Sequence, residues 1–185
     1  MKKKCTIYDV AKIAGVSPST ISRVMNTPEI VAVDTRQKVV NAVREKDYLS
    51  ALKKAHVNWK KELTADFRLD TAYQKIIVYW PQLQNSGDLP TAIFAANDLM
   101  AIGALKAFAQ LKVRVPEDIS IIGFDDIPFS DCTYPPLTTI SQPTYQMGQK
   151  AVETLLKLID KKKIKKSVEL ETELIERDSV SRWEV

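Results

Sequence analysis

The hydrophobic pattern near the N-terminus predicts two short helices joined by a tight turn, between Thr6 and Asn26. Apolar residues of the first helix share one face, at Val10, Ala11 and Ala14. Gly15 follows where the chain must turn, because glycine adopts a positive φ without steric cost. In the second helix the apolar positions recur at i, i+3 and i+4, at Ile21, Val24 and Met25.

Both helices carry start signals. Thr6 and Asp9 form a pair like a capping box, which satisfies free amide donors and places negative charge at the positive helix end. Ser17 is the expected N-cap of the second helix, and Pro18 occupies its first position, where the missing N–H costs nothing.

The outward face of the second helix is made of hydrogen-bonding residues of modest reach, apart from one proline. Its members are Pro18, Ser19, Ser22, Arg23 and Asn26. A small amphipathic helix braced by a shorter one is the geometry that places a helix in the DNA major groove. The alternative is an ordinary helical hairpin with a solvated face.

Further along, the pattern predicts a third helix and then an alternation of helices and strands. The third helix covers Asp34 to Lys46, with an apolar stripe at Val39, Val40 and Val43. The later helices are expected at Leu69–Trp80, Asn97–Lys112 and about Tyr145–Ile159. Strands are expected at TAIFAAND, ISIIGFDD, LTTIS and VELETELI. This alternation favours an α/β layer with a parallel sheet.

The sequence segments YDVAKIAGVSPSTISRVMN and TRQKVVNAV resemble the DNA-binding headpiece of the lactose-repressor family of bacterial transcription regulators. The resemblance implies that Pro18, Ser19 and Arg23 read base edges. Arg23 can donate two hydrogen bonds to guanine, Ser19 can donate or accept, and Pro18 offers apolar contact. It also implies phosphate contacts, which fix register, from Thr6, Ser17, Thr20, Ser22 and Asn26.

The second half resembles the second lobe of the same family's periplasmic-binding-protein-like sensor. The matching sequence segments are PTAIFAANDLMAIGAL, VPEDISIIGFDD, PPLTTISQP and MGQKAVETLL. The fold class we expect is α+α/β, a three-helix helix-turn-helix headpiece at residues 1–50 followed by an incomplete parallel-sheet lobe at residues 51–185. We expect the family's hinge helix and most of its first lobe to be absent, with the junction near Ser50. The residues Ala51, Leu52, Lys53 and Lys54 either imitate a basic hinge or belong to a helix and linker.

The resemblance also implies a small-molecule effector, such as a sugar, held by Phe67, Asn97 and Asp125. Ligands of open parallel sheets lie beyond the carboxyl ends of the strands, where Asn97 and Asp125 are expected. The alternative is that Asn97 or Asp98 only caps a helix and Asp125 only fixes a loop. The family's pairing helix suggests Ile102, Leu105 and Phe108 as dimer contacts, with core packing as the alternative.

Charge separates the two halves. Residues 1–50 hold nine Lys and Arg against five Asp and Glu, whereas residues 51–185 hold eighteen of each. The basic excess therefore lies on the expected headpiece, as phosphate binding requires. The lysine run at residues 161–166 is better explained as a solvated turn. No signal peptide or membrane-spanning run is expected, and Cys5 and Cys132 are interpreted as reduced thiols of a cytoplasmic protein.

The sequence offers no support for catalysis, a metal or a cofactor. The sole histidine, His56, has no nucleophile or carboxylate cluster tied to it. Asp125 and Asp126 are adjacent and would point to opposite sides of a strand, and Asp131 and Cys132 lack zinc-ligand spacing.

Two functions follow. The first is a sequence-specific DNA-binding regulator, a repressor, that acts as a homodimer on a pseudo-palindromic operator. The second is an internally deleted regulator without effector response, which acts only as an interaction partner or has lost function. Its basis is an apolar stripe with no encoded lobe to cover it, at Met147, Ala151, Leu155, Leu158 and Ile159.

Overall fold

A computed structural model describes residues 7–26, 31–54, 56–57, 61–160 and 168–182. The chain divides into two compact units, Met1–Lys61 (unit 1) and Glu62–Val185 (unit 2). The predicted limit at residue 50 falls inside a helix of unit 1, and the predicted extents of the two domains stay a prediction.

The described residues of unit 1 form three helices: α1 (Ile7–Ala14), α2 (Pro18–Asn26) and α3 (Val33–Lys54). The first two lie where the hydrophobic pattern predicts helices. Gly15 has a φ of 64° between them, and the amide of Val16 donates to the carbonyl of Ala11 at 3.1 Å. A residue with positive φ after the last turn satisfies free helix carbonyls, which is why glycine is favoured there.

Helix α3 is eight residues longer at its C-terminus than predicted. Residues 47–54 contain no glycine or proline and continue the helix, so Ala51 to Lys54 belong to a helix and not to a separate hinge. The helix ends at Lys54, and His56, two positions later, is exposed and has a φ of 57°. The amide of Val57 donates to the carbonyl of Leu52 at 3.0 Å, as in other helix ends with a left-handed residue.

The small core of unit 1 lies between its three helices. It is formed by the buried side chains of Val10, Ala11, Ile21, Val39 and Ala42. The partly buried Ile13, Ala14, Val16 and Val24 pack against it. These residues include the inward-facing positions predicted for the first short helix, and Ile21 and Val24 of the second, whereas the side chain of Met25 is not described.

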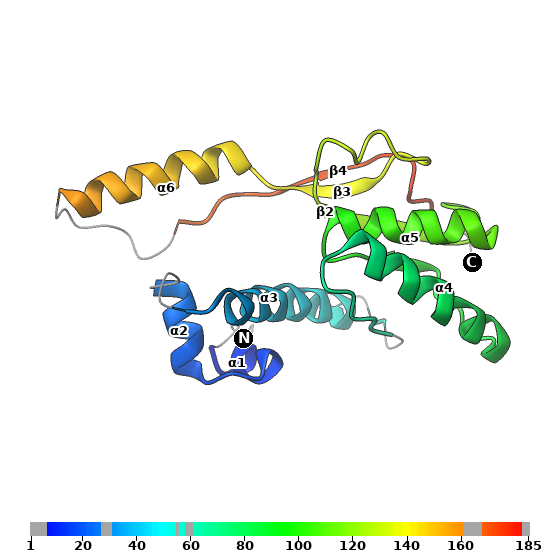
Figure 1. The fold of residues 1–185 in the computed structure, drawn as a ribbon, viewed down its shortest axis with the longest axis horizontal. Coiled ribbons are helices and arrows are strands. Elements are labelled where there is room, and N and C mark those ends of the chain that lie inside the picture. The colour runs from blue at the N-terminus through cyan, green and yellow to red at the C-terminus, as the bar shows by residue number, and fades with distance from the viewer. Residues whose placement is uncertain (1–6, 27–30, 55, 58–60, 161–167, 183–185) are drawn as a thin grey trace. The chain divides into compact units, whose positions relative to one another are not determined.

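Unit 2 is an α/β layer (Figure 1). Its helices are α4 (Leu69–Ser86), α5 (Asp98–Leu111) and α6 (Thr144–Ile159). Its strands are β1 (Ala92–Phe94), β2 (Ser120–Asp125), β3 (Thr138–Ser141) and β4 (Glu173–Ile175), in the spatial order β1-β2-β3-β4.

The sheet is mixed, which corrects the prediction of a parallel sheet. Strands β1, β2 and β3 are parallel, with Ile93 opposite Ile121 and Gly123 opposite Thr139. The terminal strand β4 runs antiparallel to β3, with Leu174 opposite Ile140. Alternation of apolar residues identifies a strand, but it does not determine the direction in which a short terminal strand pairs.

The core of unit 2 lies between α4 and α5 and between α5 and the sheet. Trp80 meets Phe108 edge to face, with ring centroids 4.8 Å apart. Helix α4 continues six residues past its predicted end, through Pro81, because Trp80 and Leu83 on either side of this exposed proline are buried in the core. That burial offsets the helix bond that proline cannot make.

The core also contains two of the residues suggested for pairing between subunits. Leu105 and Phe108 are buried inside unit 2, and Ile102 packs partly buried against the same cluster. Core packing, the alternative considered from the sequence, therefore holds for Leu105 and Phe108. Their periodicity showed an apolar helix face without showing what covers it.

The loop between α5 and β2 contains an ion pair that gives a pH-dependent prediction. The backbone amide and Nε of Arg114 donate to the Asp118 carboxylate at 2.8 and 3.0 Å. The hydrogen bonds from Arg114 lower the pKa of Asp118 to about 2. The stabilisation is therefore present above the unfolded pKa of about 3.9 and is lost as the pH falls towards about 2.

An NMR titration of the Asp118 side-chain carbon measures this pKa directly. Replacing Arg114 with alanine is expected to raise the Asp118 pKa towards its ordinary value, because the guanidinium donors are lost. The Arg68→Ala variant, which breaks a similar exposed pair with Asp70, should leave the Asp118 pKa unchanged. An unchanged Asp118 pKa in Arg114→Ala would contradict the assignment.

Candidate functional site

The N-terminus of α2 is held by the hydroxyl that the sequence predicts as its cap. The Ser17 Oγ accepts a hydrogen bond from the Thr20 amide at 3.1 Å. It also lies 2.7 Å from the Ser19 Oγ and 2.9 Å from the Thr20 Oγ1. The predicted cap at Ser17 is confirmed, and it fixes three hydroxyls at the start of the helix.

Helix α2 has one buried face and one polar face. Ile21 is buried in the core of unit 1, whereas Ser19 and Arg23 are exposed. Among the other predicted DNA-binding residues, Ser17 is exposed and Pro18, Thr20 and Ser22 are half-buried. Asn26 is the last residue of α2 and its side chain is not described, and Thr6 lies outside the described residues. The polar face thus presents hydroxyls and one guanidinium on a helix whose other side is packed.

The cap at Ser17 supports a stability prediction. Ser17→Ala is expected to lower the stability of unit 1 by ~1 kcal/mol, because the Thr20 amide loses its acceptor. Thermal unfolding followed by the helical circular dichroism signal of residues 1–61 measures the change. Ser17→Asp keeps an acceptor at the same place and should preserve stability. Equal losses in both variants would contradict a capping role.

A second candidate site lies at the carboxyl ends of the parallel strands, where Phe67 and Asn97 come together. The Asn97 Nδ2 donates to the Phe67 carbonyl at 3.2 Å, and its Oδ1 accepts from the Met100 amide at 2.9 Å. Asn97 therefore caps α5, as the alternative interpretation held, and also fixes Phe67, which has a φ of 57°. Two residues thirty positions apart meet just beyond β1.

Asp125 ends the neighbouring strand β2 at the same edge of the sheet. Its φ is 123°, and its Oδ1 accepts from the Gln142 Nε2 at 2.6 Å. The adjacent Asp126 instead pairs with Arg177 at 2.8 Å. The strand ends at Asp125, so the two carboxylates do not alternate along a regular strand as the sequence predicts. They lie at a turn and have different partners.

The role of Asp98 is not evident from the sequence. Its side chain is fully buried and accepts three hydrogen bonds: from the Ile127 amide at 2.9 Å, the Ser130 Oγ at 2.6 Å and the Thr139 Oγ1 at 2.5 Å. A Cβ on Gly123 would lie 2.2 Å from the Asp98 Oδ1, so the strand needs glycine there. Asp98 thus joins the start of α5 to β3 and to the loop that follows Asp125.

The edge of the sheet has the chemistry to bind a hydroxyl-rich molecule. An amide and a carboxylate are held in place by neighbours, and both are groups that form hydrogen bonds with hydroxyls. Preorganised polar groups of this kind orient small ligands.

Metal and thiol chemistry find little support in the part of the chain that the structure describes. No group of three His, Cys, Asp or Glu side chains there could hold a metal ion. Cys132 is exposed, and its hydrogen bond with Asp131 raises the pKa of its thiol, which disfavours the reactive thiolate. None of the described helices is long and apolar enough to span a bilayer.

Comparison with known proteins identifies a matching family and several relatives of the chain. The family described as periplasmic binding protein-like domain matches residues 26–180. The HTH-type transcriptional repressor PurR of Vibrio vulnificus is 38% identical over 149 residues, covering 79% of this chain and 43% of that protein. The probable HTH-type transcriptional repressor ExuR of Bacillus subtilis is 39% identical over 142 residues, covering 75% of this chain and 41% of its own length.

Among solved structures, the lac repressor dimer bound to operator and the anti-inducer ONPF superposes with a TM-score of 0.70. It is 33% identical, with 77% of this chain and 48% of that chain covered. The chain thus spans less than half the length of these relatives, which are named as repressors and not as enzymes. On the family match and these relatives, the chain belongs to the lactose-repressor (LacI) family of regulators with a periplasmic-binding-protein-like domain.

Proposed function

We propose that this protein is a sequence-specific DNA-binding transcription regulator, a repressor, that acts as a homodimer on a pseudo-palindromic operator. The observation that carries the proposal is the division of α2 into a packed face around Ile21 and an exposed face with Ser19 and Arg23. A helix of this kind fits the major groove with its polar side towards the bases. The relatives named as repressors support it, and a cytoplasmic location follows from contact with bacterial DNA.

In this proposal three residues read bases and the others position the helix. Arg23 donates two hydrogen bonds to a guanine, Ser19 contacts a neighbouring base edge, and Pro18 lies against a thymine methyl. Phosphate oxygens accept hydrogen bonds from the residues around them, namely Thr6, Ser17, Thr20, Ser22 and Asn26. The basic excess of residues 1–50 adds attraction that does not depend on sequence.

A dimer is part of the proposal because one copy of α2 can read only a half-site. Joining two copies makes the second contact intramolecular and raises the effective concentration of the second helix. Two-fold symmetry of the protein then requires a pseudo-palindromic operator. The solved relative bound to operator is a dimer.

We also propose a small-molecule effector, a sugar or a similar hydroxyl-rich compound, at the edge formed by Phe67, Asn97 and Asp125. The support is the hydrogen-bonded placement of Asn97 beside Phe67 and of Asp125 at the end of β2. The solved relative is bound to the anti-inducer ONPF.

A second candidate function has one specific observation in its favour. The apolar side chains of α6 are exposed, and the chain covers less than half the length of its relatives. A regulator that lost the hinge and most of one lobe would keep α2 but not respond to an effector, and would act only through partners. This alternative predicts DNA binding that no sugar alters, or no specific binding at all.

The test begins by selecting duplexes from a random pool with the full chain. Binding of the selected duplex and of a scrambled one is then followed by fluorescence anisotropy between about 50 and 200 mM salt. We expect the selected duplex to stay bound at the higher salt while the scrambled one is released. Equal, steeply salt-dependent binding of both would contradict the proposal.

A further inference from the structure

Helix α6 exposes an apolar face along its whole length. Its residues Gly148, Val152, Leu155 and Ile159 recur at helical spacing on one side. Flanking positions add Tyr145, Met147, Ala151, Leu156 and Leu158. None of the residues of α6 is buried, and the exposed fractions of Leu155, Leu158 and Ile159 are 56%, 52% and 66%.

The charges of α6 lie on the opposite side. At 100° per residue, Lys150, Glu153 and Lys157 fall on the back of the helix, and Lys150 pairs with Glu153 at 2.9 Å. The half-buried residues of the helix, Glu153 and Thr154, are polar. The occupant of the front face must therefore be apolar and need not supply a countercharge.

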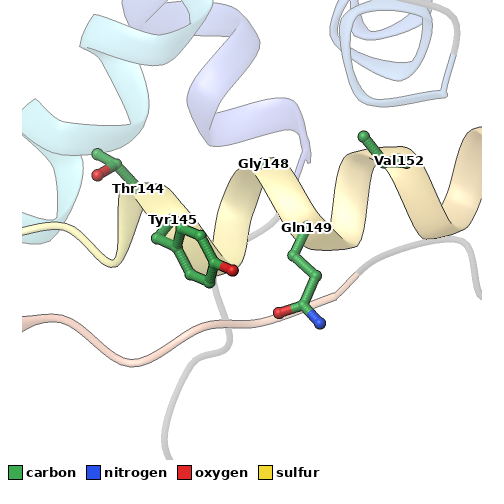
Figure 2. A pocket seen from close by; sticks show the side chains of 5 residues that line it. All are labelled: Thr144, Tyr145, Gly148, Gln149 and Val152. Carbon is green, nitrogen blue, oxygen red and sulfur yellow. The ribbon is translucent and has the colours of Figure 1, made fainter.

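One end of the face is hollow and the other is bulky. The hollow is shallow and open to solvent, has a volume of about 420 Å³ and is lined by Thr144, Tyr145, Gly148, Gln149 and Val152 (Figure 2). A Cβ built on Gly148 would meet no atom within 4 Å. Leu155, Leu158 and Ile159 project from the other half of the same face.

We propose that this face is a homodimer interface, in which α6 packs antiparallel against α6 of a second copy and each Leu155 enters the hollow over the other copy's Gly148. A two-fold axis between Ala151 and Val152 places Gly148 of each chain opposite Leu155 of its partner chain. An interface of this symmetry requires one patch to be complementary to itself, and the hollow and bulky halves of α6 meet that requirement. Both sets of charges remain in water, so no ion is desolvated.

The size of the face sets the strength of the pairing. Sixteen residues make a helix of about 24 Å, and one such helix pair buries less surface than a standard interface of about 1,600 Å². We therefore expect a weak dimer, with a Kd on the order of 10 µM. This inference rests on the proposed function in one respect: that function requires a dimer, and the α6 interface supplies one.

Sedimentation equilibrium of the full chain without DNA tests the pairing. The wild type is expected to fit a monomer–dimer equilibrium. Leu155→Glu and Gly148→Leu should each raise the Kd at least about tenfold, since one places a charge in the interface and the other fills the hollow. Val78→Glu, on an exposed apolar position of α4, is the matched control and should leave the Kd unchanged.

Both variants should keep the wild-type melting temperature, because α6 has no buried residue and Gly148 has open space beside it. A chain that stays monomeric at every concentration overturns the proposal. So does open-ended aggregation that is insensitive to Leu155→Glu.

Cross-linking tests the orientation. In a chain with Cys5 and Cys132 replaced by serine, Thr144→Cys and Ile159→Cys proteins are mixed and oxidised. Antiparallel pairing predicts mainly mixed dimers joining residue 144 to residue 159. Mainly 144–144 and 159–159 products would overturn it.

These results separate the interface from DNA recognition. A monomeric protein that still prefers one duplex would refute the α6 interface and leave the proposed function in place. If Leu155→Glu breaks the dimer but the wild-type dimer binds all duplexes equally, the proposed function is refuted and the interface stays in place.

Discussion

Replacing Asp98 with alanine is expected to lower the free energy of unfolding of unit 2 by ~3–5 kcal/mol. The carboxylate is fully buried and accepts from the Ile127 amide, the Ser130 hydroxyl and the Thr139 hydroxyl. Alanine would leave all three donors without an acceptor, and each unsatisfied buried donor costs about 1–3 kcal/mol. Urea denaturation of the full chain, monitored by tryptophan fluorescence, measures the loss.

The matched control is Asp66→Ala, which removes an exposed carboxylate from the same unit. It should change the free energy of unfolding by less than about 0.5 kcal/mol. A loss below about 1 kcal/mol for Asp98→Ala would show that the three donors find other partners, and would contradict the central place given to Asp98 in the fold.

Arg23→Ala is expected to lower affinity for the selected duplex by about 1–3 kcal/mol for each half-site. The exposed guanidinium is the group on the outer face of α2 best suited to a bidentate contact with guanine. The loss should be concentrated at one base pair of each half-site, because base contacts specify sequence whereas phosphate contacts only position the helix. Titrating duplexes changed at single base pairs locates it.

Lys12→Ala removes the same charge from an exposed position of α1 and serves as the control. It should lower binding of all duplexes alike, or not at all, and leave their order unchanged. Equal effects of the two substitutions at every base pair would mean that Arg23 acts only through its charge.

The local signals in the sequence were the most informative. The Ser17 cap, the turn at Gly15 and the burial of Ile21 were predicted because each depends on residues within one or two turns of helix. The meeting of Phe67 with Asn97 is different, since its residues are thirty positions apart and were grouped only through resemblance to a family.

What the sequence did not show depends on distant partners. Asp98 was seen only as a possible cap because its three donors lie 29 to 41 positions away. Leu105 and Phe108 were considered for an interface because periodicity marks an apolar face without naming its cover. The exposed stripe of α6 was foreseen, since no segment of suitable length was left to pack against it.

The proposed function depends on recognition of one particular duplex by the outer face of α2, led by Arg23 and Ser19. The most direct measurement is the ratio of affinities for the selected and the scrambled duplex at about 150 mM salt, for the wild type and for Arg23→Ala. We expect a ratio of about 10³ or more for the wild type and a clear fall for the variant. A ratio near one for the wild type, or the same ratio in Arg23→Ala, would contradict it.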